Sequence, residues 1–183
     1  MTNRLRALPL ALVLPLALAL ALAAPLRAEA RDDAGRLPWL GLRLGGVAAA
    51  SATRGGAGGA GGGGGYALFD ARDFLADASL DLFVGDRTHV FAAGLGAYFP
   101  FLQGNVSPYA GGGVRAGWTK FGGDGTFGMI PFAAGGLVFG RNFYPQLRLE
   151  VAYFLATSRE RAAGVRGDGV RAHGAQATFG LAF

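Results

Sequence analysis

The chain ends in the stretch Ala175-Gln-Ala-Thr-Phe-Gly-Leu-Ala-Phe183, in which apolar residues occupy every second position. The positions between them are polar or small. Successive side chains of a β-strand point to opposite faces of a sheet, so this period of two predicts a strand with one apolar face. The last residue of that strand, Phe183, is aromatic and lies on the apolar face.

The same alternation recurs upstream. In residues 147–154 the charged Arg148 and Glu150 alternate with apolar residues, and residues 40–45 and 76–84 alternate in the same way. Short clusters of Gly, Asp and Asn separate the segments and are typical of hairpin turns. Three further runs have the length of a strand and are rich in glycine, alanine and aromatic residues: 89–99, 109–118 and 129–139. The pattern predicts seven strands joined by short turns, with no long amphipathic helix.

Residues 1–30 have the features of an export signal. Two arginines precede an uncharged apolar run at residues 7–26, and Ala28-Glu29-Ala30 forms a small-x-small cleavage site. We expect cleavage after Ala30, which leaves a short N-terminal segment at 31–36. The alternative is an uncleaved membrane anchor, because about twenty apolar residues can span a bilayer.

Composition excludes several classes of function. The 183 residues include 33 glycines and no cysteine, so disulfides, thiolate metal sites and a cysteine nucleophile are absent. The export segment holds three of the 17 basic residues and one of the 12 acidic ones, so the mature chain has 14 and 11 and a net charge of +3. No basic cluster is interleaved with aromatic residues, and we expect no nucleic-acid partner.

An exported chain of alternating strands can form a soluble β-sandwich or a transmembrane barrel. The long apolar faces opposite charged ones favour the barrel, because lipid offers the backbone no hydrogen-bond partners and a closed sheet needs none. Aromatic residues near strand ends predict girdles at the two lipid–water boundaries. These residues are Trp39, Tyr98, Phe99, Tyr109, Trp118, Phe139, Tyr144, Tyr153 and Phe183.

The C-terminal stretch resembles the β-signal of bacterial outer-membrane proteins. Residues Ser107–Gly117 and Leu147–Tyr153 resemble the fifth and seventh strands of small eight-stranded barrels of the OmpA/OmpX and OmpW kind. The resemblance covers residues 37–183. It implies an all-β, up-and-down antiparallel transmembrane β-barrel, porin-like in architecture, in the outer membrane of a Gram-negative bacterium. It also implies that Phe179, Leu181 and Phe183 are recognised by the barrel-assembly machinery.

Such barrels have an even number of strands, so one more strand must lie between Ser51 and Asp73. That interval contains nine glycines and two alanines at residues 55–65. Glycine in a strand carries a high cost in backbone entropy. We therefore interpret residues 51–66 as a glycine-rich extracellular loop, with residues 66–73 as a candidate short second strand.

Six charged residues share the face of the strands that is opposite the apolar one: Arg43, Asp77, Asp81, Arg115, Arg148 and Glu150. A charge facing lipid near the bilayer midplane costs about 2–4 kcal/mol, so we predict that all six point into the barrel. Three positive and three negative charges can pair and fill the narrow lumen of an eight-stranded barrel. The alternative is a polar path for a small solute, because small residues such as Gly41 and Gly113 flank the charges and leave room for water.

No catalytic, cofactor or metal site is predicted. Some small barrels are lipid A deacylases with a His/Ser pair, but neither His89 nor His173 has a serine two positions on. We predict a non-enzymatic barrel that anchors in the outer membrane and presents extracellular loops. A narrow channel for small or apolar solutes is the alternative, and a lipid-modifying enzyme is disfavoured. The arginines of the expected extracellular loop at residues 158–169 could contact anionic lipopolysaccharide.

Overall fold

The computed structural model describes residues 39–51, 56–71, 73–121, 125–141, 145–162 and 165–183, with side chains except at 158–171. The predicted export signal at 1–30, the segment at 31–36 and Tyr144 lie outside the described residues. Within the described ranges no helix is long and apolar enough to cross a membrane.

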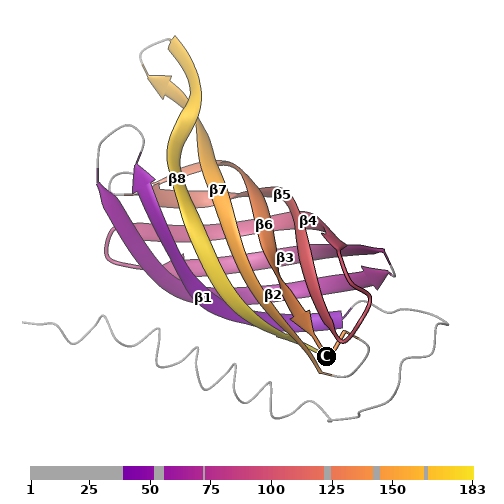
Figure 1. Cartoon of the computed structure of the whole chain (residues 1–183). Coiled ribbons are helices and arrows are strands. Elements are labelled where there is room, and N and C mark those ends of the chain that lie inside the picture. The colour runs from indigo at the N-terminus through magenta and orange to yellow at the C-terminus, as the bar shows by residue number, and fades with distance from the viewer. Residues whose placement is uncertain (1–38, 52–55, 72, 122–124, 142–144, 163–164) are drawn as a thin grey trace, which may run out of the picture.

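The described chain forms eight antiparallel strands that follow one another around a closed barrel, and β8 pairs back onto β1 (Figure 1). The strands are β1 (Trp39–Ser51), β2 (Ala57–Ala71), β3 (Phe74–Val84), β4 (Thr88–Pro100), β5 (Val106–Phe121), β6 (Thr126–Phe139), β7 (Gln146–Ala162) and β8 (Val165–Ala182). The predicted fold class and all seven predicted strands are confirmed.

The prediction of a glycine-rich loop at 51–66 is wrong for residues 57–66. Residues 57–71 form β2, which pairs with β1 on one side and with β3 on the other. Pairing on both sides satisfies the backbone of the tract, and this overrides the poor strand propensity of glycine. Glycine is also needed at Gly64, because a Cβ there would lie 2.0 Å from the carbonyl oxygen of Leu80.

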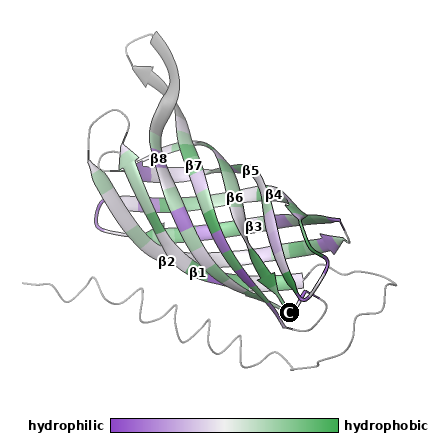
Figure 2. Ribbon diagram, in the orientation of Figure 1, coloured by the Kyte–Doolittle hydropathy of each residue, from purple (hydrophilic) through white to green (hydrophobic). Residues whose placement is uncertain are grey.

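The two faces of each strand differ as the alternation predicts. Exposed large apolar residues lie on the outer face of the barrel and include Leu80, Leu95, Phe127, Val151 and Phe179. Figure 2 shows hydrophobic residues spread over the wall. The inner face carries the buried core and the buried polar residues. An outer surface of this kind suits an apolar surrounding and not water.

The two ends of the barrel differ. At one end, here called the terminal end, the backbone of Phe183 exchanges hydrogen bonds of 3.1 and 2.8 Å with Leu40. At the other, the hairpin end, β7 and β8 project beyond the other strands (Figure 1). The expected loop at 158–169 is therefore wrong in part, since β7 continues to Ala162 and β8 begins at Val165. A register shift between Ala156 and Thr157 marks where this extension starts.

Three aromatic residues expected in the outer girdles point inward instead. Trp39, Tyr98 and Tyr109 are at most 5% exposed and belong to the core. Tyr109 and Arg115 lie an even number of positions apart on β5 and so share strand parity, which means that their side chains lie on the same face. A strand that directs the arginine inward therefore also directs the tyrosine inward. Phe99, Trp118 and Tyr153 do face outward, as predicted.

Candidate functional site

The six charged residues predicted for the lumen are all buried, none more than 4% exposed. Arg43 lies on β1, Asp77 and Asp81 on β3, Arg115 on β5, and Arg148 and Glu150 on β7. All six therefore come from odd-numbered strands. We call this set the lumen network.

Asp81 lies between two arginines. Arg43 binds it with both prongs of its guanidinium group, Nε to Oδ1 at 2.7 Å and Nη2 to Oδ2 at 2.5 Å. Arg115 Nε approaches the same Oδ2 at 3.6 Å. The two-pronged contact is the stronger of the two, because its geometry matches a carboxylate.

Arg148 has the largest number of partners. Its Nη1 donates to Asp77 Oδ2 at 2.6 Å, its Nε donates to the Tyr109 hydroxyl at 2.7 Å, and its Nη2 pairs with Glu150. Tyr109 donates in turn to Glu150 at 3.0 Å, and the Tyr98 hydroxyl donates to Asp77 at 3.1 Å. Every nitrogen of this guanidinium group thus has an acceptor.

Three tyrosine rings surround the same guanidinium group. Its Cζ lies 4.5 Å from the ring centre of Tyr98, 4.9 Å from that of Tyr109 and 5.8 Å from that of Tyr66. Tyr98 and Tyr109 also meet edge to face at 5.3 Å. Cation–π attraction therefore adds to the ion pairs in holding Arg148 in place.

The two halves of the lumen network join across the barrel. Arg43 Nη1 lies 4.0 Å from Glu150 Oε1, which links the Arg43–Asp81 pair to Arg148. The six charges thus form one connected series whose positive and negative charges are equal in number. Buried charges are tolerated when they are paired in this way.

Glycines on the even-numbered strands make room for the lumen network. A glycine is the register partner of each of the six charges; for example, Gly64 faces both Arg43 and Asp81, and Gly94 faces Arg115. A Cβ at Gly94 would lie 2.4 Å from Cγ of Arg115, and one at Gly96 would lie 2.4 Å from the Tyr98 hydroxyl. A larger residue at these positions would collide with the side chains that fill the lumen.

The alternative of a polar path required room for water beside the small residues, but aromatic rings occupy the space beside two of them. A Cβ at Gly41 would lie 2.5 Å from the ring of Tyr66, and one at Gly113 would lie 2.9 Å from the ring of Phe132. Apolar side chains flank the charges towards both ends of the barrel. Val47, Val90, Ile130 and Phe154 lie towards the hairpin end, and Leu68, Leu75 and Val138 lie towards the terminal end.

A further buried ion pair, outside the lumen network and at the terminal end, was not predicted. Arg141, in the turn after β6, binds Asp70 through Nε and Nη2, and donates to the carbonyls of Leu102 and Ala71. It therefore ties together the three turns at this end. The sequence contained no signal for a turn arginine that reaches across the barrel to Asp70.

The two histidines lie on the outer wall and have aromatic neighbours. His173 Nδ1 is 3.1 Å from the Tyr153 hydroxyl, and the ring of His89 is 6.3 Å from that of Trp118. Among the residues described, no three His, Cys, Asp or Glu side chains gather as metal ligands would.

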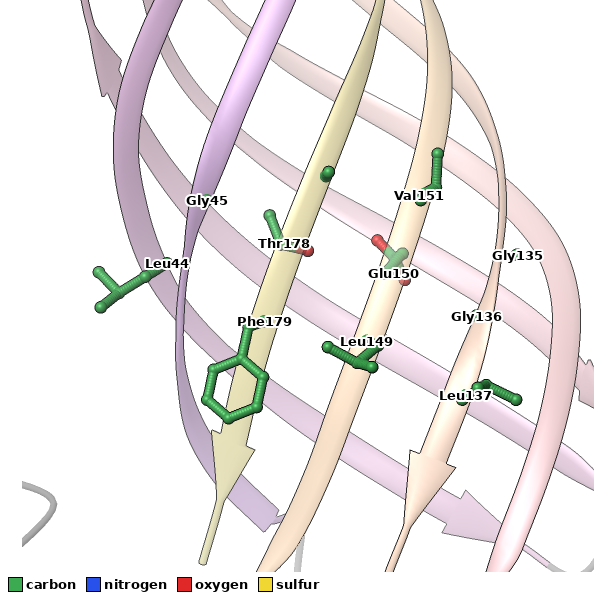
Figure 3. Close-up of a pocket in the computed structure, with 11 residues that line it drawn as sticks. Leu44, Gly45, Gly135, Gly136, Leu137, Leu149, Glu150, Val151, Thr178 and Phe179 are labelled. Atoms are coloured by element: carbon green, nitrogen blue, oxygen red, sulfur yellow. The ribbon is translucent and has the colours of Figure 1, made fainter.

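A groove of about 570 Å³ crosses the outer face of β6, β7, β8 and β1 (Figure 3). Leu44, Phe179, Leu149 and Leu137 form a ridge of register partners along it, and Gly135 and Ala177 form its shallow floor. Its surface is almost wholly apolar, since Glu150 and Thr178 on the same strands face the lumen.

The three residues of the predicted C-terminal signal lie at the closing seam between β8 and β1. Phe179 is the register partner of both Leu44 and Leu149, and Leu181 is the partner of Leu42. Phe179 is about half exposed on the outer face. Phe179 is thus accessible from outside the barrel wall.

These features define a small, closed, eight-stranded β-barrel with an apolar outer face and a charged, filled interior. The solved structures with this fold include the Neisserial surface protein NspA, at 15% identity and a TM-score of 0.59, covering 80% of this chain and 97% of that one. They also include the N-terminal β-barrel domain of Pseudomonas aeruginosa OprF, at 12% identity and 0.49 (80% and 100%), and Ail of Yersinia pestis, at 12% and 0.46 (79% and 95%). The chain thus has the fold of small outer-membrane barrels. No protein-family profile matches the chain, and no curated protein sequence matches it.

Proposed function

We propose that this protein is a non-enzymatic barrel of the bacterial outer membrane that anchors an extracellular hairpin and keeps a closed lumen. The observation that carries the proposal is the lumen network. Its six charges pair with one another and do not line a path for a solute. The apolar outer face supports a position in the membrane. The projecting ends of β7 and β8 form the hairpin that would be presented outside the cell.

The orientation follows from the termini. Both ends of the barrel chain would lie in the periplasm, so the hairpin end would face outside. The export signal supports this placement, and we propose cleavage after Ala30. N-terminal sequencing of the protein from outer-membrane fractions should begin at Arg31. Recovery in the soluble periplasm, or a retained Met1, would contradict the proposed location.

Closure of the lumen is tested by electrical recording. The refolded protein, identified as folded by its heat-dependent shift in electrophoretic mobility, should give little or no steady conductance in a planar lipid bilayer. Large, stable conductance would favour the alternative function of a narrow channel. In that case substitutions in the lumen network should change ion selectivity while leaving stability almost unchanged.

Two partners follow from the same proposal. Phe179, Leu181 and Phe183 would be read by the barrel-assembly machinery, since they end the strand that closes the barrel. Outer-membrane lipid would cover the apolar wall, and the arginine-rich hairpin sequence would lie near the anionic head groups of lipopolysaccharide.

A further inference from the structure

Lys120 is the only charged residue that the strands place on the outer face of the barrel, among the residues whose side chains are described. It is also the only lysine of the chain. It stands one residue before the end of β5, between buried Thr119 and the hairpin-end turn, and it shares strand parity with outward-facing Trp118. A charge that faces lipid is costly at the bilayer midplane and costs little near the boundary with water. Lys120 therefore marks the lipid–water boundary at the hairpin end.

Two aromatic side chains lie beside Lys120 on the same face. His89, near the start of β4, is its register partner, and the ring centre of His89 lies 6.3 Å from that of Trp118. The Trp118 ring reaches the turn before β6, because a Cβ on Gly125 would lie 1.9 Å from its Cζ2 atom. These three side chains, Lys120, His89 and Trp118, are here called the outer cluster. They bring together three kinds of N–H donor: an ammonium group, an imidazole and an indole.

Internal partners do not account for the charge of the outer cluster. Within the described chain the ion pairs join arginines to buried carboxylates, and none of them involves Lys120. His89 opposite Lys120 is not an attractive pair, and it becomes repulsive when the imidazole is protonated. Arg87 belongs to the same end of the barrel but lies towards β2, since its Cβ is 3.8 Å from the Cβ position of Gly58. An external anion would satisfy the outer cluster.

We propose that the outer cluster binds a phosphate group of a phosphorylated glycolipid of the lipopolysaccharide class. Lys120 supplies the charge, and His89 and Trp118 supply further donors to the phosphate oxygens. Phe91, the register partner of Trp118 and 51% exposed, lies on the same face and would contact the acyl chains. The proposal rests on the proposed function, which turns the hairpin end to the outside, and it assigns a lipid contact to the barrel wall itself.

The first test uses the reactivity of Lys120, because its amine and the N-terminal amine are the only two in the chain. The purified mature barrel, in detergent without divalent cations, is treated with an amine-acylating reagent and either diphosphorylated or dephosphorylated lipid A. Peptide mass spectrometry gives the labelling rate of each amine. The ratio of Lys120 to N-terminal labelling should be about fivefold lower with the diphosphorylated lipid, because a bound phosphate shields the ammonium group.

The N-terminal amine is the internal control, since it reports any general effect of an anionic micelle. An equal ratio in the two lipids would overturn the proposal. It would mean that Lys120 only extends its ammonium group into water beyond the lipid.

The second test measures lipid retention by native mass spectrometry, with each variant first shown to be folded by its heat-dependent mobility shift. Lys120→Gln should retain diphosphorylated lipid A about fivefold less than the wild type, and Lys120→Arg should retain it equally. Arg87→Gln removes the same charge from the turn between β3 and β4 and is the matched control, which should bind as the wild type.

Two outcomes of this second test would overturn the proposal. One is undiminished retention by Lys120→Gln, and the other is equal retention of phosphatidylglycerol by the wild type, which would show no preference for the glycolipid. Both tests use purified protein and measure binding alone. They can therefore fail while fractionation still places the protein in the outer membrane, and a failure of that placement leaves their result unchanged.

Discussion

Replacing Arg148 with methionine tests the lumen network at its most heavily bonded residue. Methionine keeps much of the apolar stem but removes the bonds to Asp77 at 2.6 Å and to Tyr109 at 2.7 Å, and the pairing with Glu150. Asp77 would keep only the Tyr98 hydroxyl at 3.1 Å among its described partners. Glu150 would keep the Tyr109 hydroxyl at 3.0 Å and the more distant Arg43 at 4.0 Å. Breaking a buried ion pair on one side costs about 3–5 kcal/mol, and we expect a loss of unfolding free energy in this range.

The reasoning is checked by a double-mutant cycle with Asp77→Asn. Unfolding free energies are measured in urea with the barrel in lipid vesicles, followed by tryptophan fluorescence. The two changes together should cost less than the sum of the single changes, by about 1–3 kcal/mol. Arg87→Met, in the exposed turn between β3 and β4, is the matched control and should leave the midpoint unchanged. Additive effects within about 0.5 kcal/mol would refute direct coupling of the two charges.

Other substitutions test separate parts of the barrel by the same unfolding assay. Gly64→Ala would place a Cβ 2.0 Å from a β3 carbonyl oxygen and should lower stability by about 1–3 kcal/mol, while Gly61→Ala, whose Cβ meets nothing of the described chain within 4 Å, should not lower it. Equal effects of the two changes would contradict the close approach. Arg141→Ala removes the two-pronged bond to buried Asp70, which keeps its hydrogen bond from Gln146 at 3.3 Å, and should cost about 1.5–3 kcal/mol; a loss below about 1 kcal/mol would show that the turns hold together without Arg141. Deletion of Phe183 should stop assembly in cells but permit refolding into detergent, and normal assembly in cells would mean that the terminus is not a recognition signal.

Much of the fold follows from strand parity. Alternation in residues 147–154 separates an outer apolar face from an inner charged one, and the structure places Arg148 and Glu150 on the inner side. The same parity rule places Tyr109 with Arg115, although an aromatic residue near a strand end also suits a girdle. The face of the strand on which a residue lies therefore predicted the direction of its side chain better than its position along the strand did.

Two features could not be read in this way. The tract in β2 has almost no side chains, so it carries no alternation, and only its pairing with β1 and β3 makes it a strand. The partners within the lumen network are set by closure of the barrel. Arg148 and Asp77 are 71 residues apart, and no local pattern predicts that they meet.

The charges of the lumen network come from alternate strands, and this arrangement bears on the order in which the barrel can fold. Neighbouring strands form hairpins, yet no ion pair of the lumen network joins neighbouring strands. The aspartates of β3 form ion pairs with arginines on β1, β5 and β7, and the ionic contact between β1 and β7 spans the closing seam. A single hairpin holds these charges apart, and the ion pairs that join β7 to β3 and to β1 form only when the barrel closes. Such contacts between distant segments form slowly because a long loop must close first. The complete network therefore stabilises the closed barrel more than a partly assembled sheet, which makes closure of the barrel cooperative.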